Sequence, residues 1–336
     1  MKALVVTAPN QPAVQEIPEP RPGRYDALVR IEACGICNST DWKLIEGTMS
    51  WAPPFPIVLG HESVGIVTEV GPGVRKFKVG DRVSRPLAFW PGSEPGLNVA
   101  MGGFAERGMV RDGAAMAADG DESLAEDYNV QRQIVLPPNL DAVTGALAIS
   151  LSETASMLRH LPNLRGKKIV VAGTGIAGLA FTLWAKLAGA FVITLGRRAS
   201  RLEEAKKTGA DATVDTTRDN FPKEILQIAA GPVDGMIEAT GDAALAGRLL
   251  EALSEQGFAA AYGVPPTGTS YDPLWKSHPV EEHLSFPWVA DLLARGWIRP
   301  DWFISHTWPF EEVLDAFEQA HRGDVRKGFV KIGGAS

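Results

Sequence analysis

The stretch that decides the fold is "KIVVAGTGIAGLAFTLWAKLAGA", residues 168–190. A short β-branched run leads into Gly173, Gly175 and Gly178, and an apolar helical pattern follows. In this spacing the first glycine permits a tight turn, the second lets the backbone approach a pyrophosphate, and the third lets the helix pack on the strand. The free amides at the start of the helix then face the anion. The stretch predicts a dinucleotide-binding loop, with a purely structural glycine turn as the alternative.

The sequence around this loop divides into two regions of different periodicity. After the loop, predicted strands at 190–196, 211–216, 233–241 and 256–263 alternate with predicted helices at 201–209, 222–230 and 244–254. This alternation predicts a doubly wound parallel sheet with crossover helices. The first 142 residues instead hold short β-branched runs separated by turns, which predict a β-rich domain. A chain of 336 residues is long enough for both.

The composition of the chain argues against several classes of partner and location. The net charge is −7 and no run of Lys and Arg stands out, so a nucleic-acid partner is not expected. The apolar runs are broken by glycine and lysine, which argues against a membrane span, and the N-terminus lacks the pattern of a signal peptide. Two cysteines do not make a disulfide framework. We therefore expect a cytoplasmic protein. An acidic segment at 111–129 lacks hydrophobic periodicity and is interpreted as an exposed insertion.

The residues after the next predicted strand indicate which dinucleotide binds. NAD sites place an acidic residue there for the ribose hydroxyls. Here the strand ends at Leu195, Gly196 stands at the acidic position, and Arg197 and Arg198 follow. Guanidinium groups attract a 2′-phosphate that a carboxylate would repel, so the sequence predicts NADP(H) rather than NAD(H). The alternative is that the two arginines are solvent-facing residues at a helix start.

The only two cysteines, Cys34 and Cys37, lie three residues apart in "ACGIC" (33–37). This spacing suits half of a zinc clamp or a redox pair. However, no third cysteine exists for a clamp, and the pair lies in the β-rich half rather than in a βαβ unit. Downstream, "PFPIVLGHESVGIV" (54–67) supplies His61 and Glu62.

With these motifs the chain resembles the zinc-type medium-chain dehydrogenases/reductases, which include alcohol and polyol dehydrogenases. The resemblance covers nearly the whole chain and rests on "ACGIC", on residues 54–83, on "GGFAE" (102–106), on "GTGIAG" (173–178), on "VDGMIEATG" (233–241) and on the C-terminal "FEEVLDAFE…GFVKI". It implies a GroES-like β-rich catalytic domain over 1–152 and a Rossmann domain over 153–285. A C-terminal segment, 286–336, is expected to return to the catalytic domain, with the active site in the cleft between the domains.

The resemblance also implies a catalytic zinc held by Cys37 and His61, with Glu62 as an intermittent ligand or nearby carboxylate. Cys34 matches a packing position. The family's third ligand falls near Ile149, which cannot bind a metal, so Glu153 one helical turn later is the candidate. A zinc-free relative that keeps these polar residues packed is the alternative. A structural zinc needs four cysteines near residues 85–105, where this chain has none, so none is expected.

Further roles follow from the same resemblance. Ser39 is expected to hydrogen-bond the substrate oxygen and begin a proton relay. Trp42 stands where the family often has a relay histidine, so Asp41, Lys43 or water is needed to complete the route. The implied cofactor contacts are Gly173, Thr174, Gly175, Ile176, Ala177, Gly178, Gly196, Arg197, Arg198 and Thr240. The implied substrate pocket includes Trp51, Phe89 and Trp90, of which the last two are equally suited to domain packing. Trp275, His278 and His283 are further candidates for the cleft, or plain surface groups.

The predicted function is therefore an NADP(H)-dependent, zinc-assisted oxidoreductase that acts on an alcohol/carbonyl pair. Two alternatives stay open: a zinc-independent quinone or enoyl reductase of the same superfamily, and a non-catalytic NADP(H)-binding protein. The resemblance implies a homodimer or homotetramer built on the last strand of the Rossmann sheet, and "GFAAAYGV" (257–264) is compatible with such an edge strand.

Overall fold

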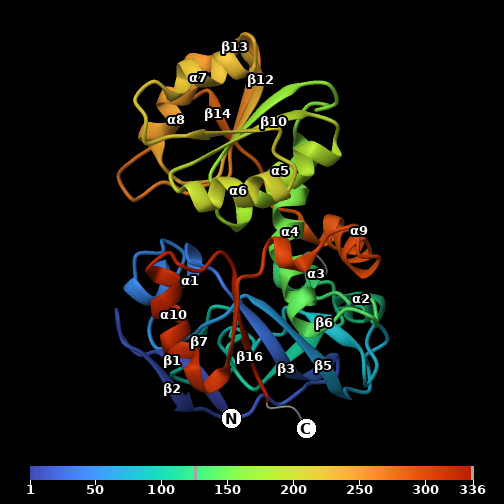
Figure 1. The fold of residues 1–336 in the computed structure, drawn as a ribbon. Helices are drawn as coiled ribbons and strands as arrows, with labels where there is room; N and C mark the ends of the chain where they lie inside the picture. The colour runs from blue at the N-terminus through green and yellow to red at the C-terminus, as the bar shows by residue number, and fades with distance from the viewer. Residues whose placement is uncertain (125–126, 334–336) are drawn as a thin grey trace. The chain divides into compact units, whose positions relative to one another are not determined.

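The structure is a computed structural model that describes residues 1–124 and 127–333 (Figure 1). The chain divides into two compact units. The first unit comprises Met1–Ile149 together with Phe286–Ser336, and the second comprises Ser150–Ser285. Each unit has its own sheets and core, and each is described by itself below. In the described part of the chain, no helix combines the length and the apolar character that crossing a membrane requires.

The second unit is built on one parallel sheet with the strand order β11-β10-β9-β12-β13-β14. The strands are β9 (Lys168–Ala172), β10 (Phe191–Gly196), β11 (Ala212–Asp215), β12 (Val233–Glu238), β13 (Leu253–Ala261) and β14 (Trp275–Ser277). The direction of winding reverses between β9 and β12. In open sheets of this kind, ligands bind at the carboxyl ends of the strands beside such a reversal.

Helices cover both faces of this sheet, and the side chains of β9 show why. Val170 and Ala172 belong to one buried cluster with residues of α7 and α8, whereas Ile169 and Val171 belong to another with residues of α5. Successive residues of a strand point to opposite faces, so an uninterrupted apolar run fits a strand buried on both. Figure 1 shows α5 and α6 on one face and α7 and α8 on the other. These helices span α5 (Ile176–Leu187), α6 (Ala199–Lys207), α7 (Phe221–Ile228) and α8 (Ala243–Leu249).

The prediction that 257–264 forms the edge strand is wrong. β13 pairs with β12 on one side and with β14 on the other, so the edge strand is β14. β14 has only three residues and follows a loop rich in Gly and Pro, which leaves too short a run for a strand pattern to show. The predicted helix 244–254 is also too long, because α8 ends at Leu249 and β13 already begins at Leu253.

The first unit contains two sheets. One has the order β2-β1-β4-β7, and the other has the order β15-β16-β3-β5-β6 with β8 also paired to β3. The strands are β1 (Lys2–Val6), β2 (Pro12–Glu16), β3 (Asp26–Ile36), β4 (Ile57–Val58), β5 (Glu62–Val70), β6 (Arg82–Ser84), β7 (Asn98–Val99), β8 (Arg107–Arg111), β15 (His306–Pro309) and β16 (Gly328–Lys331). The many short strands and turns give the β-rich architecture that the sequence predicts.

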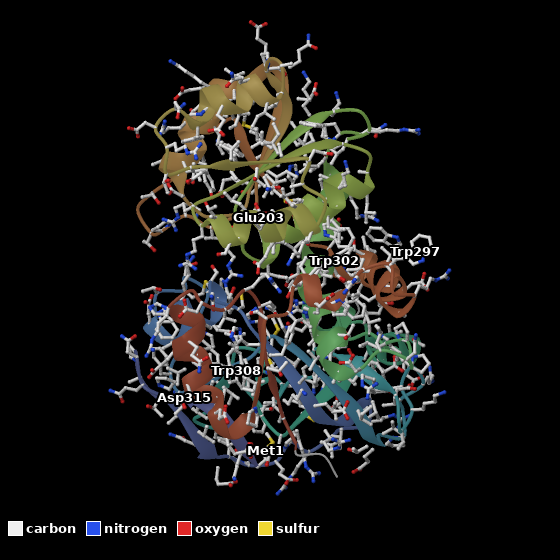
Figure 2. All side chains as sticks on the ribbon, viewed as in Figure 1. Met1, Glu203, Trp297, Trp302, Trp308 and Asp315 are labelled. Atoms are coloured by element: carbon white, nitrogen blue, oxygen red, sulfur yellow. The ribbon has the colours of Figure 1, made fainter. Side chains whose placement is uncertain are left out.

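The end of the chain completes the second of these sheets. β16 pairs antiparallel with β3, and Gly328 lies opposite Ile36. Helix α10 (Val313–His321) places its apolar side in the same buried cluster as Leu4 of β1. Trp308 of β15, labelled in Figure 2, also belongs to this cluster. The C-terminal residues are therefore part of the core of the first unit.

The interpretation of 111–129 as an exposed insertion is wrong for residues 112–116, which are mostly buried, whereas residues 118–123 are exposed. Helices α2 (Gly113–Ala118) and α3 (Tyr128–Gln131) form there, and Ala115 and Met116 are buried. The carboxylate of Asp112 accepts hydrogen bonds from the amides of Ala115, Arg75 and Lys76. The first part of this segment is thus packed against the unit although its sequence has no apolar period. Residues 125–126 lie outside the described residues.

Candidate active site

Antiparallel register brings three distant parts of the chain to one edge of the sheet that contains β3. Cys37 directly follows β3, and the paired strand β5 begins at Glu62, opposite Gly35. The other neighbour, β16, begins at Gly328, opposite Ile36, so Lys327 lies at the same edge. Gly35 is required here, because a Cβ at this position would lie 2.4 Å from Glu62 Oε2.

The side chains at this edge form a set of metal-ligand donors. Cys37, His61 and Glu62 each offer one atom, and these sulfur, nitrogen and oxygen atoms all lie within 4.8 Å of one another. Zinc binds such donors at about 2.0–2.3 Å, which places the ligands of one ion about 3.5 Å apart. Modest side-chain rotations would bring this set to that spacing. Three protein ligands with a further position left open is the pattern of a catalytic zinc, so the residues fit the ion.

A buried carboxylate orients the histidine of this set. Asp41 lies in α1 (Thr40–Glu46) and is fully buried, and its Oδ1 is 3.0 Å from His61 Nδ1. The two atoms are in close contact without the alignment of a hydrogen bond. Asp41 Oδ2 accepts a 2.9 Å bond from the amide of Cys37. Burial disfavours the charged imidazole, but the carboxylate of Asp41 holds the pKa of His61 well above its ordinary value. A carboxylate behind Nδ1 leaves Nε2 available to a metal.

Lys327 holds Glu62. Its ammonium group donates to Glu62 Oε2 and to the carbonyl oxygen of Ile36 at 3.0 Å. Both side chains are almost fully buried, at 1% and 3% exposed. Burial alone would raise the pKa of Glu62, yet the charges of Lys327 and His61 lower it. Glu62 is thus held as an anion with one oxygen engaged, while its Oε1 lies 4.0 Å from His61 Nε2.

The second cysteine belongs to the core and not to this donor set. Cys34 is fully buried in the cluster that contains Ile36 and Phe104. Burial raises the pKa of its thiol well above the ordinary value, so the sulfur stays protonated. Both cysteines are free. Of the two cysteines, only Cys37 belongs to the donor set.

The other predicted residues of this site lie in varied surroundings. Ser39 is exposed at the start of α1, where its side chain makes no capping bond. Trp42 stacks on His321 of α10 with ring centroids 3.8 Å apart, so a histidine does lie beside the relay position. Glu153 is in α4 (Ala142–Met157), in the second unit, and the hydroxyl of Tyr262 donates to it at 3.5 Å.

The predicted pocket aromatics differ in burial. Trp51 is 56% exposed, whereas Phe89 is buried in the cluster of Ala3 and Val5. Trp90 lies under the guanidinium of Arg111 at 4.0 Å. The position of Phe89 favours its packing alternative. Among the further candidates, Trp275 is buried in the core of the second unit, His283 is half-buried, and His278 stacks on His160.

The glycine loop in the second unit has the geometry that its sequence predicts. Gly173 follows β9 with φ +119, a conformation that suits glycine. Gly175 is the N-cap residue directly before α5 and faces open space, since a Cβ there would meet nothing within 4 Å. A Cβ on Gly178 would lie 2.0 Å from the carbonyl oxygen of Gly173, so the helix can pack this closely only on a glycine. Ile176 and Ala177 form the first turn of α5, which is half-buried.

Gly196, the last residue of β10, is in contact with the loop. A Cβ there would lie 2.7 Å from Thr174 Cγ2, so the threonine side chain occupies the space beside the strand end. Arg197 and Arg198 follow, both exposed, with Arg198 at the start of α6. Thr240 comes after β12, across the reversal of strand order, and its Cγ2 would be 3.2 Å from a Cβ on Gly173. The predicted cofactor residues of the second unit therefore gather at the carboxyl ends of β9, β10 and β12.

Sequence reasoning missed the residues that hold these groups in place. Lys327 and Glu238 are both buried and charged, and each lies next to a predicted site residue. The sequence indicates Asp41 only as a candidate for the proton relay, whereas in the structure it contacts His61. A buried ion pair formed across 265 residues leaves no local pattern in the sequence. Glu238 does fall in the "VDGMIEATG" motif, so its place before Thr240 was the one available signal.

Known proteins are similar to this chain in both sequence and architecture. The family model "Alcohol dehydrogenase GroES-like domain" matches residues 23–119, and "Zinc-binding dehydrogenase" matches residues 177–279. An alcohol dehydrogenase of Geobacillus stearothermophilus is 30% identical over 273 residues, covering 79% of this chain and 78% of that protein. A sorbitol dehydrogenase of Rattus norvegicus is 27% identical over 348 residues, covering 98% and 95%.

Among solved structures, a putative zinc-binding dehydrogenase from Sinorhizobium meliloti, bound to NADP, superposes with a TM-score of 0.82. It is 27% identical, and the match covers 98% of each chain. The match spans residues of both units. This chain therefore belongs to the zinc-type medium-chain dehydrogenases/reductases, the family of the alcohol and polyol dehydrogenases.

Proposed function

We propose that this protein is an NADP(H)-dependent oxidoreductase that transfers hydride between the nicotinamide and an alcohol or carbonyl substrate, assisted by one zinc ion. The observation that carries the proposal is the convergence of Cys37, His61 and Glu62 within 4.8 Å. Glu153 of α4 is proposed as the third ligand when Glu62, an intermittent ligand, does not hold that position. Zinc, when bound, would supply a Lewis acid that polarises the substrate oxygen.

The residues around the donor set prepare it for that ion. Asp41 presents the ring of His61 with Nε2 toward Glu62. Lys327 keeps Glu62 ionised and engages its Oε2, which leaves Oε1 for the metal. We propose that Ser39, two residues beyond Cys37, hydrogen-bonds the substrate oxygen and passes its proton on. Its exposed side chain makes no capping bond and is free to take this role.

The second unit is proposed to bind the dinucleotide along the carboxyl ends of β9, β10 and β12. The pyrophosphate lies on the start of α5, where Gly175 leaves open space. Preference for NADP(H) is supported by Gly196 in place of an acidic residue and by the exposed guanidinium groups of Arg197 and Arg198. Charge-assisted hydrogen bonds to a 2′-phosphate are each worth about 1.5–3 kcal/mol, so we expect a preference of about 10- to 100-fold.

Substrate, assembly and location are parts of the same proposal. The substrate is a small alcohol, polyol, aldehyde or ketone, and the indole of Trp51 is proposed to face it. We propose a homodimer, or a pair of dimers, that joins through β14, the edge strand of the parallel sheet. A free Cys37 thiol suits a reducing compartment, and we propose the cytoplasm.

Two measurements test this function. Metal analysis is expected to find about one zinc per subunit, lost together with activity in Cys37→Ala. Catalytic efficiency on a panel of alcohols and carbonyls is expected to be higher with the phosphorylated cofactor. Activity that survives chelation on activated C=C bonds would support the zinc-independent reductase. NADPH binding without turnover on any substrate, in both parent and variant, would support the non-catalytic alternative. A clear preference for NAD(H) would overturn the cofactor assignment.

A further inference from the structure

A buried carboxylate organises the turn that follows β12. Glu238 is the last residue of that strand and is fully buried. Its Oε1 accepts bonds from the Thr240 amide at 2.5 Å, from the Thr240 hydroxyl and from the Gly241 amide at 3.1 Å. The Thr240 oxygen in turn accepts a 3.0 Å bond from the amide of Asp242. The hydroxyl proton of Thr240 is therefore directed inward, and this threonine offers a cofactor its backbone and methyl group rather than a hydroxyl donor.

The remaining oxygen of Glu238 is held by a residue from another loop. The hydroxyl of Tyr271 donates to Glu238 Oε2 and also lies 2.9 Å from the carbonyl oxygen of Gly263. Burial, and then the bond to Glu238, raises the pKa of Tyr271, so the phenol stays protonated and remains a donor. Its ring lies 6.2 Å from that of Trp275, at the start of β14. Tyr271 is thus an anchor for the loop between β13 and β14.

The two segments approach each other very closely. A Cβ on Gly263 would lie 2.3 Å from the amide nitrogen of Gly241 and 2.6 Å from Glu238 Oε2. A Cβ on Gly241, where φ is +81, would lie 2.7 Å from the carbonyl oxygen of Val264. Glycines permit this contact, but they supply no side chain to maintain it. Backbone bonds from the amides of Tyr262 and Gly263 to the carbonyl oxygen of Glu238 join the segments where they meet, and the Tyr271–Glu238 bond adds a side-chain link between them.

A cavity of about 350 Å³ lies between these segments. One wall is the turn Thr240–Ala244 and the other is formed by Pro266 and Thr269. Pro266 and Thr269 belong to the loop that Tyr271 anchors, whereas the turn is held by Glu238. The link between Tyr271 and Glu238 therefore helps to set the distance across the cavity, beyond the backbone bonds at the start of the loop. The cavity borders Thr240, which contacts the glycine loop at Gly173.

We propose that Tyr271 is a positioning residue for the dinucleotide: by fastening the 263–271 loop to Glu238, it sets the cavity beside Thr240 to a width that accepts part of the cofactor. This rests on the proposed binding of NADP(H) at the carboxyl ends of β9 and β12. Tyr271 itself need not touch the cofactor. Its effect passes through Glu238 to the amides of Thr240 and Gly241.

The test compares Tyr271→Phe with Tyr25→Phe in the full-length protein. Tyr25 is a matched control, because its hydroxyl also donates to a carboxylate, Asp119, at 2.9 Å but lies in the first unit. In the cofactor-free protein, we expect Tyr271→Phe to speed hydrogen exchange at the amides of Thr240 and Gly241. We expect the Kd for NADPH, from fluorescence titration, to rise about tenfold while kcat at saturating cofactor changes less than about twofold. Tyr25→Phe should leave all three unchanged.

The outcomes separate this inference from the function on which it rests. Faster exchange with an unchanged Kd would overturn it, because the link would then be structural only. Unchanged exchange would also overturn it, since the turn would not depend on Tyr271. A parent protein that binds neither NADPH nor NADH would instead refute the proposed function. Should Tyr271→Phe fold poorly, Glu238→Gln keeps the side-chain size, weakens the acceptor and should change exchange and Kd in the same direction.

Discussion

The ion pair behind the donor set provides the strongest test of how this site is built. Replacing Lys327 by Met keeps the length and the apolar stem of the side chain but removes its charge. Glu62 then stays buried, at 3% exposed, without the cation that now contacts its Oε2. The carbonyl oxygen of Ile36 also loses its 3.0 Å donor. Breaking a buried pair in this way costs about 3–5 kcal/mol.

This cost should appear in the thermal unfolding of the first unit. For a unit of about 200 residues, 1 kcal/mol corresponds to roughly 2–4 °C, so the midpoint of the zinc-free protein should fall by about 6–20 °C. Bound zinc is a cation beside Glu62 in both proteins, and in Lys327→Met it takes the place of the missing ammonium group. The stabilisation that zinc provides, measured as the difference between zinc-loaded and chelator-treated samples, should therefore be larger in Lys327→Met than in the parent.

Two further variants show whether charge is the cause. Lys76→Met removes an exposed lysine, whose ammonium group donates to the carbonyl oxygen of Gln133, and it should lower the midpoint much less. Combining Lys327→Met with Glu62→Gln removes both charges and should recover much of the loss. Equal effects of Lys327→Met and Lys76→Met in the zinc-free protein would refute the reasoning. A zinc-induced rise in the unfolding midpoint that is no larger in Lys327→Met than in the parent would also refute it.

Three other substitutions test separate parts of the structure. Asp41→Asn removes the carboxylate behind His61 and should weaken zinc binding about 10- to 100-fold, measured by competition with a chromogenic chelator. Gly178→Ala should abolish tight NADPH binding, because its Cβ would lie 2.0 Å from the carbonyl oxygen of Gly173; titration of NADPH fluorescence checks this. Asp141→Ala removes the cap before α4 and should cost about 1 kcal/mol at pH 7. Burial raises the pKa of Asp141, but bonds from the first turn lower it overall, so the cap acts fully above the unfolded pKa near 4. Its contribution is lost as the pH falls through the lowered folded pKa, so the difference between parent and Asp141→Ala in urea unfolding should shrink as the pH is lowered below about 4.

The alternating half of the fold could be predicted because its signals are local. β-branched runs, the glycine loop and helical periodicity each occupy fewer than 25 residues, and together they predict parallel strands and crossover helices. These local signals do not give the order of the strands, which the structure supplies. β14 could not be predicted, since three residues after an irregular loop carry no period. The segment 111–129 failed for a related reason: the carboxylate of Asp112 secures it by bonds to backbone amides, which an apolar pattern does not record.

At the site, sequence motifs identify donors but not what orients them. Cys37, His61 and Glu62 are found in two short motifs, and the register of β3 with β5 brings them together. The cation that holds Glu62 belongs to the residue directly before β16. The pairing of β16 with β3 brings this residue to Glu62, from which it is 265 residues away in the sequence. Motif spacing cannot predict such a contact, because it depends on which strand lies beside β3.

Each unit has a buried glutamate that a residue distant in the sequence holds in place. For this reason sequence motifs predict only part of each site. In each case a glutamate at the end of a strand is fully or almost fully buried beside a predicted ligand-binding residue: Glu62 after His61, and Glu238 before Thr240. A buried carboxylate is costly unless every lone pair finds a donor or cation. Lys327 in one unit and Tyr271 in the other each donate to one oxygen of the glutamate. Each comes from the segment that completes its sheet, β16 or the loop before β14, so each site is fully formed only when the last strand of that sheet is in place.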